Sequence, residues 1–203
     1  MRDRQGHAAT RPRNRESFAE RRERRGAVED PEVVLEAAAR FLEARPRSIA
    51  EVRRRLGGAG YPPELIDGAV ARLVELGMLD DAEFARLWVE SRDRARPRGE
   101  RALRQELAVK GIDRGVVDAL LDERSEQDGA ADRDAAAAAR LLERQQRALS
   151  RESDPRRRRQ KAYAVLARNG FDSETCGAAV RRWELAIGAA NDADSDSDAD
   201  GLP

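Results

Sequence analysis

The chain has 203 residues, of which 38% are charged and 4% aromatic, and 39 basic residues balance 39 acidic ones. Its abundance of Ala, Leu, Arg and Glu is typical of exposed helices around modest cores, so we expect little or no strand. The neutral balance argues against a polycation made for nucleic acid, and any basic surface must be local.

The sequence also indicates the cellular compartment in which the protein is expected. Cys176 is the single cysteine and cannot form an internal disulfide, and no apolar run approaches the roughly 20 residues that span a bilayer. The first residues, MRDRQGH, lack the apolar stretch of a signal peptide. We therefore expect a cytoplasmic protein without a membrane partner, and we take a monomer as the default.

The two ends differ from the body in charge and periodicity. Residues 1–30 hold nine arginines against six acids, and residues 191–203 hold five aspartates and no base. Both ends lack the apolar periodicity that a packed element needs. We expect a disordered Arg-rich arm over 1–30 and a disordered acidic tail over 190–203.

One pattern occurs three times in the body: an apolar residue, a Leu four positions on, a Gly four further, then an apolar residue and a second helix. The copies read VRRRLGGAGYPPELIDGAV, LRQELAVKGIDRGVVDALL and AYAVLARNGFDSETCGAAV. Apolar residues at i and i+4 stripe one face of a short helix, and the glycine ends that helix in a left-handed conformation. The recurring residues are Leu56, Leu107 and Leu166, then Gly60, Gly111 and Gly170.

Two such helices cannot bury their stripes alone, so each copy requires a preceding helix, for which 31–44, 81–94 and 133–149 are candidates. We predict an all-α protein of about nine helices in three tandem three-helix repeats, forming an elongated array that can curve. N-cap signals agree with this count. They are Ser48 with Glu51, Asp80 with Glu83, and Asp154 before Pro155. The predicted repeats are 31–79, 80–124 and 125–189.

Residues suited to catalysis or metal binding are scarce. His7 is the only histidine and lies in the arm. Cys176 takes the position of Ile66 and Val117 in the other repeats, which predicts a small core residue. One cysteine and one histidine do not make a zinc site. We predict that the chain is not an enzyme and has no cofactor or small-molecule substrate.

Two further patterns favour structural interpretations. The glycines at 57, 58 and 60 could suggest a phosphate cradle, but they follow a helix rather than a strand, and no Gly-Lys-Ser/Thr sequence occurs. Asp80 and Asp81 could form a carboxylate pair, but Asp80 stands where a helix cap belongs. We interpret the glycines as turn residues and Asp80 as a cap.

Arginines gather at one place in each repeat. Cations near a helix N-terminus are mildly unfavourable, which suggests a use for the charge. An equally favoured alternative is a solvated face paired with acids such as Glu100 and Glu106. The scarcity of aromatics disfavours base stacking, which leaves arginine contacts to phosphate or carboxylate. Candidate partner-binding residues are Arg92, Arg94, Arg98, Arg101, Arg104 and Lys110, with Arg53, Arg54 and Arg55 second; Arg156–Arg159 with Lys161 form the third cluster.

Residues 77–112 resemble the central signature of the RecX family of recombination regulators. That signature is a Gly, a Leu-Asp-Asp start, a Phe-Ala pair, an arginine-rich stretch, a Pro-x-Gly and a Leu-Arg-x-Glu-Leu-x-x-Lys-Gly-Ile run. The resemblance extends over about 40–185. The matching residues are Gly77, Leu79, Asp80, Asp81, Phe84, Ala85, Arg92, Arg94, Pro97, Gly99, Leu103, Arg104, Glu106, Leu107, Lys110, Gly111 and Ile112.

The resemblance implies three tandem three-helix units that lie along the groove of the RecA nucleoprotein filament. Proteins of that kind inhibit RecA ATP hydrolysis, strand exchange and the co-protease activity that induces the SOS response. The rival hypothesis is a DNA-binding helical-repeat protein that competes for single-stranded DNA. Two residues depart from the family pattern: Glu100 puts an acid into a usually basic stretch, and Asn169 stands where an arginine is common.

Overall fold

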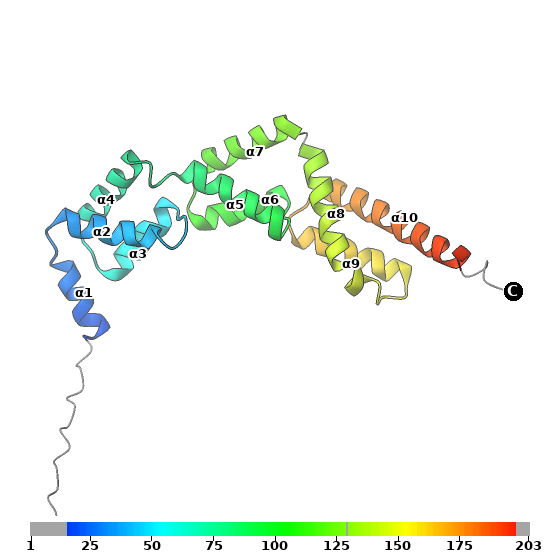
Figure 1. Cartoon of the computed structure of the whole chain (residues 1–203), viewed down its shortest axis with the longest axis horizontal. Helices are drawn as coiled ribbons and strands as arrows, with labels where there is room; N and C mark the ends of the chain where they lie inside the picture. Colours follow the sequence, from blue (N-terminus) through cyan, green and yellow to red (C-terminus); the bar gives the residue numbers. More distant parts are fainter. Residues whose placement is uncertain (1–15, 129, 198–203) are drawn as a thin grey trace, which may run out of the picture. The chain divides into compact units, whose positions relative to one another are not determined.

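The computed structural model describes residues 16–128 and 130–197, without the side chains of 125, 127, 128, 130–132 and 189–197. Within these residues the protein contains ten helices and no strand (Figure 1), which confirms the predicted all-α fold. The helices are α1 Phe18–Gly26, α2 Pro31–Leu42, α3 Ile49–Ala59, α4 Pro63–Glu75, α5 Asp81–Ala95, α6 Glu100–Lys110, α7 Arg114–Asp128, α8 Ala130–Leu149, α9 Pro155–Arg168 and α10 Ser173–Ser197.

The described chain divides into two compact units. An N-terminal unit comprises the chain up to Arg45 together with Val52–Leu76, and a C-terminal unit comprises Pro46–Glu51 and the chain from Gly77 onward. The boundary falls within α3. The C-terminal unit therefore contains the second and third repeats and the first turn of α3.

The predicted repeat pattern is confirmed by burial and backbone geometry. Leu56, Leu107 and Leu166 are buried at equivalent positions on α3, α6 and α9. The glycines that follow have φ values of +101° at Gly60, +81° at Gly111 and +87° at Gly170, so each helix ends through the left-handed conformation. The preceding helices α2, α5 and α8 begin within three residues of the predicted starts.

In the N-terminal unit, α2 packs against α4. Val34 and Ala38 of α2 are fully buried, as expected for residues one turn apart on an amphipathic helix. Val70 and Leu73 supply the buried face of α4. The unit thus encloses a small core of aliphatic side chains.

Helix α1 is a difference from the sequence-based expectation, because Phe18–Gly26 lies inside the arm expected to be disordered. Ser17 and Glu20 form a reciprocal capping box at its start. Arg22 Nη1 donates a hydrogen bond of 3.1 Å to the Gly58 carbonyl, and the Arg25 guanidinium lies 5.6 Å from the Tyr61 ring centroid. Polar contacts rather than an apolar stripe hold this helix, so hydrophobic periodicity could not reveal it. Residues 1–15, including His7, lie outside the described residues.

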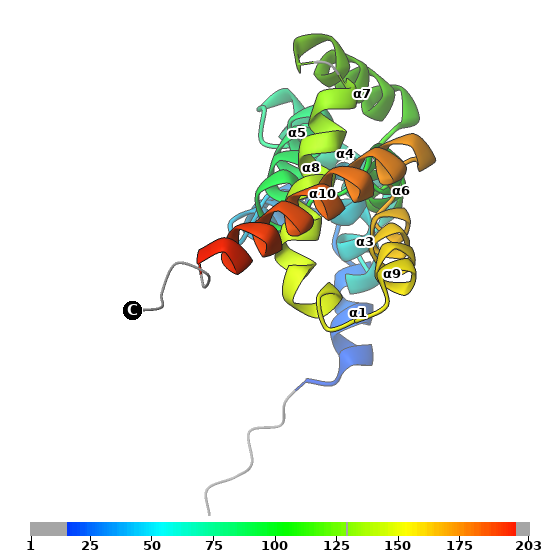
Figure 2. The ribbon, with the colours of Figure 1, turned by 90° about the vertical axis from the view of Figure 1, so that its right-hand side faces the viewer.

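In the C-terminal unit, each repeat has its own apolar core. The core of the second repeat includes Phe84, Leu103 and Leu107. That of the third includes Phe171 and Cys176, and there α8 crosses α10 in both views (Figures 1 and 2). The helices extend past the expected boundaries, since α7 continues to Asp128 and α10 to Ser197, inside the segment predicted as an acidic tail. Residues 198–203 lie outside the described part.

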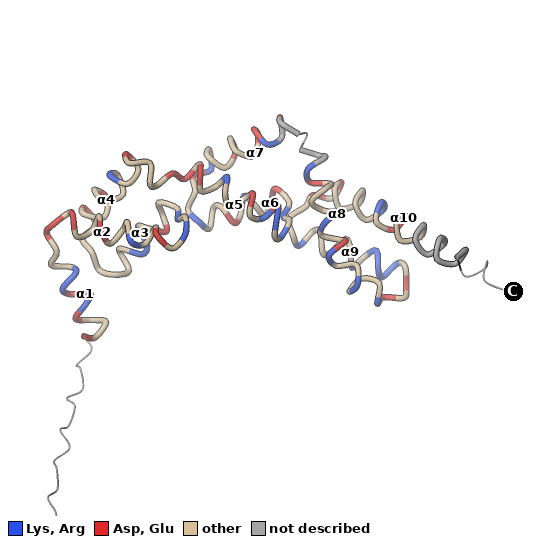
Figure 3. Tube along the Cα trace, viewed as in Figure 1, with Lys and Arg blue, Asp and Glu red and all other residues tan. Residues whose placement is uncertain are grey.

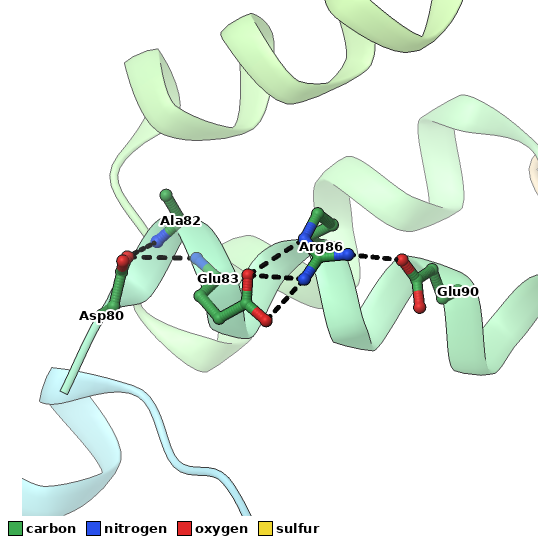
Figure 4. A network of polar contacts seen from close by, with 5 residues as sticks. All are labelled: Asp80, Ala82, Glu83, Arg86 and Glu90. Atoms are coloured by element: carbon green, nitrogen blue, oxygen red, sulfur yellow. Dashed lines mark hydrogen bonds and ion pairs between the residues drawn. The ribbon is translucent and has the colours of Figure 1, made fainter. Parts of the chain in front are cut away.

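Asp80 caps α5, as the sequence predicted. Its carboxylate accepts hydrogen bonds from the backbone N–H groups of Ala82 and Glu83 at 2.8 and 3.0 Å (Figure 4). The Glu83 side chain instead pairs with Arg86, which also reaches Glu90 at 2.8 Å. These contacts support the interpretation of Asp80 as a cap rather than as half of a catalytic pair.

Candidate partner-binding surface

The predicted arginine cluster of the second repeat lies at the end of α5, in the connecting segment 96–99 and on α6 (Figure 3). Pro97 is buried and anchors the segment. Gly99 is the N-cap of α6, and its N–H donates a 3.0 Å hydrogen bond to the carbonyl of Asn169 at the end of α9. The third repeat therefore fixes the backbone that carries this cluster.

Glu106 is the centre of a half-buried network. Its Oε2 accepts hydrogen bonds from Arg92 Nε at 2.6 Å and from Trp88 Nε1 at 2.9 Å. Arg98 Nε lies 3.2 Å from Glu106 Oε1, without hydrogen-bond geometry, so this contact is an ion pair. The side chains of Arg92 and Arg98 are only 25% and 27% exposed, which indicates that their charges are committed to contacts within the repeat.

Lys110 is equally committed to the fold. Its Nζ lies 2.8 Å from Glu51 Oε1 and 4.6 Å from the Trp88 ring centroid, and Arg92 also stacks on that ring, at 4.5 Å. Buried Ser48 donates a hydrogen bond of 2.7 Å to the Lys110 carbonyl. Lys110 thus joins the end of α6 to the start of α3.

Arg104 bridges two carboxylates. Its guanidinium pairs with Glu100 one turn earlier on α6 and with Asp118 of α7. These pairs match the solvated, acid-compensated face that the sequence left open as an alternative. Together with Arg92, Arg98 and Lys110, Arg104 is already neutralised by the chain's own acids.

Arg94 and Arg101 differ from these four. Both side chains are exposed, and neither forms an ion pair within the described residues. Arg101 Nη2 donates a 3.0 Å hydrogen bond to the Ala167 carbonyl, which leaves its charge uncompensated. These two predicted residues remain available to a partner.

The three arginines of α3 lie in the N-terminal unit. Arg53 is 3.0 Å from Asp67, with 53% of its side chain exposed. The Arg55 guanidinium lies 5.7 Å from the Phe41 ring centroid. Arg54 is exposed between them. This set is solvated, and its binding role remains a prediction.

The third cluster, at the start of α9, is largely compensated by nearby acids and a carbonyl. Arg159 lies 2.8 Å from Glu184, and Lys161 lies 2.5 Å from Glu152. Arg158 Nη1 donates to the Glu152 carbonyl at 3.4 Å. Solvated pairing is therefore the better description of this cluster than a free basic surface.

A cleft of about 520 Å³ in the C-terminal unit gathers a different set of arginines. We call it the arginine cleft. Arg96 and Arg98 line it from the segment after α5, Arg144 from α8 and Arg168 from α9, and among the described residues no carboxylate lines it. An anion entering the cleft would meet the guanidinium groups of Arg96, Arg144 and Arg168, which form no ion pair among the described residues, whereas Arg98 is paired with Glu106.

Sequence reasoning missed Arg144 and Arg168 as members of this site, because they lie more than 30 residues from the predicted cluster. Arg144 donates to the carbonyls of Arg94 and Ala95, where a cation offsets the negative end of the α5 dipole. Arg168 is exposed, and its Nε donates to the Ala164 carbonyl at 3.1 Å. No pattern in the linear sequence links either residue to Arg96.

Asn169 accounts for one departure from the family pattern. Its side-chain oxygen accepts a hydrogen bond from Arg98, and its Nδ2 donates to the Val165 carbonyl at 2.7 Å. Glu100, the other departure, pairs with Arg104. Asn169 therefore orients Arg98, whereas Glu100 compensates the charge of Arg104.

The described residues show no cluster of three or more His, Cys, Asp or Glu side chains that could hold a metal. Cys176 is fully buried in the core of the third repeat, as predicted, and burial raises the pKa of its thiol. Within the described ranges, no helix is long and apolar enough to cross a bilayer. The burial of Cys176 and the raised pKa of its thiol indicate a packing role for this residue.

The fold is a tandem array of three-helix domains, and comparison with known proteins identifies the family to which this array belongs. Family models match all three domains: the first RecX three-helix domain over 35–73, the second over 80–121 and the third over 132–180. The chain belongs to the RecX family of regulatory proteins.

Comparison with individual proteins supports this family assignment. The chain is 35% identical to the regulatory protein RecX of Mycobacterium avium over 147 residues, covering 72% of this chain and 82% of that one. It is also 35% identical to RecX of Deinococcus radiodurans, covering 87% and 76%. The crystal structure of RecX from Lactobacillus salivarius shares the fold, with a TM-score of 0.62, 19% identity and coverage of 77% and 98%.

Proposed function

We propose that this protein binds the RecA nucleoprotein filament and inhibits RecA ATP hydrolysis, strand exchange and co-protease activity. Through that inhibition it modulates homologous recombination, DNA repair and the SOS response. Membership of the RecX family supports the RecA partner. The observation that carries the proposal is the arginine cleft, an anion-attracting surface built by the two C-terminal repeats. We further propose that the protein acts in the cytoplasm, as a monomer and without catalysis.

We propose that different arginines have different tasks in this binding. Arg94, Arg96, Arg101 and Arg168 are exposed and lack ion pairs within the described chain, so they would contact the filament directly. The paired residues of α5 and α6 would shape the surface instead, because their charges are already compensated. Arg53, Arg54 and Arg55 would provide a second, weaker contact. Several weak linked contacts suit a partner that itself repeats.

The test is inhibition of the RecA DNA-dependent ATPase by a charge-reversed variant, Arg96→Glu with Arg101→Glu and Arg168→Glu. We expect the concentration for half-inhibition to rise about tenfold or more, equivalent to about 1.4 kcal/mol. Helicity should be unchanged, because these side chains are exposed.

The matched control reverses three arginines that pair on their own helices, Arg40, Arg72 and Arg86. It changes net charge by the same amount, so a loss confined to the first variant would implicate Arg96 and Arg168 of the arginine cleft together with the exposed Arg101. Equal inhibition by wild type and the first variant would remove the cleft from the proposal.

A second candidate function is direct binding of single-stranded DNA, which the lack of carboxylates among the described residues of the arginine cleft favours. Phosphate contacts release counterions, so binding would weaken steeply as salt rises. A salt titration without RecA separates the two functions. Tight, steeply salt-dependent binding of DNA alone would favour this candidate over a RecA-dependent mode.

A further inference from the structure

The glycines that end the second helix of the second and third repeats each receive the start of an earlier helix. A Cβ on Gly111 would lie 2.3 Å from the Cβ of Ala50, in the first turn of α3. A Cβ on Gly170 would lie 2.4 Å from the Cβ of Ala102, in the first turn of α6. The missing side chain therefore makes room for the second helix of the preceding repeat. We call each such glycine, with the carbonyls just before it, a glycine seat.

A hydrogen bond accompanies each of these two contacts. Ser48, just before α3, donates through its hydroxyl to the Lys110 carbonyl at 2.7 Å. The N–H of Gly99, just before α6, donates to the Asn169 carbonyl at 3.0 Å. Both carbonyls belong to the residue that precedes the glycine. The last carbonyls of a helix have no partner within that helix, so a donor from the arriving segment satisfies one of them.

Gly60, which ends α3 in the first repeat, has the same kind of contact. A Cβ on Gly60 would lie 2.6 Å from Arg22 Cγ and 2.8 Å from the Arg22 carbonyl oxygen. Arg22 belongs to α1, and its Nη1 donates a hydrogen bond of 3.1 Å to the carbonyl of Gly58, two residues before Gly60. Helix α1 thus brings both the close approach and the donor to the first glycine seat.

Helix α1 is not itself part of a repeat. The model of the first RecX three-helix domain matches residues 35–73, which begin after α1. The helix has nine residues and buries none of its side chains. Isolated helices shorter than about 12–15 residues are marginal in water, so α1 depends on its contacts with the first repeat. It reaches its seat at Arg22, near its middle, whereas α3 and α6 reach theirs in the first turn.

The last repeat needs no corresponding element. Ala50 and Ala102 lie six and five residues before the buried leucine of their helices, and the same positions of α9 hold Gln160 and Lys161. Both of these side chains are exposed, and both are too large for a space that holds a methyl group. Among the described residues no repeat follows to offer α9 a seat. The first repeat is therefore the one at which a seat would be left open.

We propose that the glycine seat at Gly60 is a docking surface for a helix, and that α1 fills it as a stand-in for the second helix of a preceding repeat. Terminal units of repeat arrays need a polar outer face that ends the array. Arginines and glutamates make up most of α1, which suits it to this task. Polar contacts hold it, so it docks and leaves without disturbing the apolar core of the first repeat. This role does not depend on RecA binding or on the arginine cleft.

The test is hydrogen exchange of the full chain, followed by mass spectrometry at slightly acidic pH, where unprotected amides exchange slowly enough to follow. The amides of Arg21–Ala27 report α1, and those of α2 report the core of the same unit. We expect the α1 amides to exchange at least about tenfold more slowly than in an unstructured peptide, but faster than those of α2.

Gly60→Ala should uncover α1, because the new methyl group would occupy the place of Arg22. Exchange of the α1 amides should then come within about twofold of the unstructured rate, while the α2 amides stay protected. The matched control is Gly77→Ala. Gly77 also has a positive φ, of +67°, but nothing lies within 4 Å of its Cβ, so the control introduces the backbone strain without the clash. It should leave α1 protected.

A second pair of variants tests the hydrogen bond and stays decisive if Gly60→Ala fails to fold. Arg22→Ala removes the donor to the Gly58 carbonyl, and Arg21→Ala removes a neighbouring exposed side chain that forms no hydrogen bond among the described residues. Alanine favours a helix at least as well as arginine, so neither change weakens α1 itself. We expect Arg22→Ala to speed α1 exchange about threefold or more, and Arg21→Ala to change it by less than about twofold.

Four results would overturn the proposal. They are exchange of α1 at the unstructured rate in the wild type, retained protection of α1 in Gly60→Ala, equal loss in Gly77→Ala, and equal exchange in the two arginine variants. None of these measurements involves RecA, so failure of this proposal and failure of the proposed function are distinguishable.

Discussion

Gly99 and Gly170 are in such close contact that a Cβ on Gly99 would lie 2.4 Å from the Gly170 carbonyl oxygen. Gly99 has an ordinary φ of −74°, so close approach rather than backbone conformation requires a glycine here. The contact joins the start of α6 to the end of α9. A Cβ on Gly170 would likewise lie 2.4 Å from the Cβ of Ala102, so both glycines allow the second and third repeats to approach closely.

We expect Gly99→Ala to destabilise the protein by about 1–3 kcal/mol, because the methyl group would displace backbone rather than a flexible side chain. Thermal unfolding followed by circular dichroism measures the change. Gly68→Ala is the matched control, since nothing lies within 4 Å of its Cβ and it is inside α4. That variant should be stabilised by about 0.5–1 kcal/mol. If both variants behaved alike, the close contact would not exist in solution.

Glu106→Gln should destabilise the second repeat by about 1–3 kcal/mol. The substitution removes the negative charge that compensates Arg92 and Arg98 in a half-buried site. Denaturant unfolding monitored by tryptophan fluorescence would report it, because Trp88 donates to the same carboxylate. Glu83→Gln, on the exposed face of α5, should change stability by less than about 0.5 kcal/mol. If Glu106→Gln left the stability of the protein unchanged, the proposed role of Glu106 at the centre of this network would be wrong.

Asp134→Asn should stabilise the protein at neutral pH and have no effect in acid. The pKa of Asp134 is raised on folding from 3.8 to about 6, so the folded state favours the protonated form. The protonated carboxyl of Asp134 therefore contributes its full stabilisation below about pH 4. This contribution to the free energy of unfolding is lost as pH rises through about 6. We expect a gain of about 1 kcal/mol at pH 7, after allowing for solvent screening of a partly exposed group.

Glu152 provides a control for Asp134, because its pKa is shifted in the opposite direction. Lys161 lowers the pKa of Glu152, so the stability from Glu152 is present above its unfolded pKa and lost as pH falls. Glu152→Gln should therefore lower stability at pH 7 and lose its effect in acid. Urea unfolding at pH 3.5, 5 and 7 measures both variants. A gain for Asp134→Asn that persisted at pH 3.5 would show that burial of the Asp134 charge and its repulsion by Glu100 and Asp172 are not the source of the gain.

Ser48→Ala should cost about 1–2 kcal/mol. It removes the hydrogen bond to the Lys110 carbonyl and the acceptor for the Glu51 N–H, both at a fully buried position. Ser91→Ala, at an exposed position on α5, should have almost no effect. Hydrogen exchange of the α3 amides would distinguish a local from a global loss. Equal stability of the two variants would show that Ser48 contributes little.

Much of this fold could be predicted because hydrophobic spacing and helix ends are local signals. The position of Cys176 in the repeat identified a core residue, and Asp80 was recognisable as a cap. Helix α1 was not predicted, since Ser17 and Arg22 stabilise it through polar contacts rather than an apolar stripe.

The candidate site was less predictable. Pairing of the arginines with acids such as Glu100 and Glu106 was one of two alternatives that the sequence left open, and nothing near Arg98 in sequence indicates that Asn169 will accept its hydrogen bond. Arg144 and Arg168 reach the arginine cleft only through the packing of α8 and α9.

The dependence of α6 on later segments has a consequence for biosynthesis. The Gly99 N–H is bound by the Asn169 carbonyl and the Glu100 N–H by Asp134, both of which leave the ribosome well after α6 itself. During translation the second repeat therefore emerges with the first turn of α6 unfinished, and it matures only when the third repeat is made. A nascent chain halted before α8 would carry a frayed arginine-rich turn, so the surface proposed to meet a partner is assembled last.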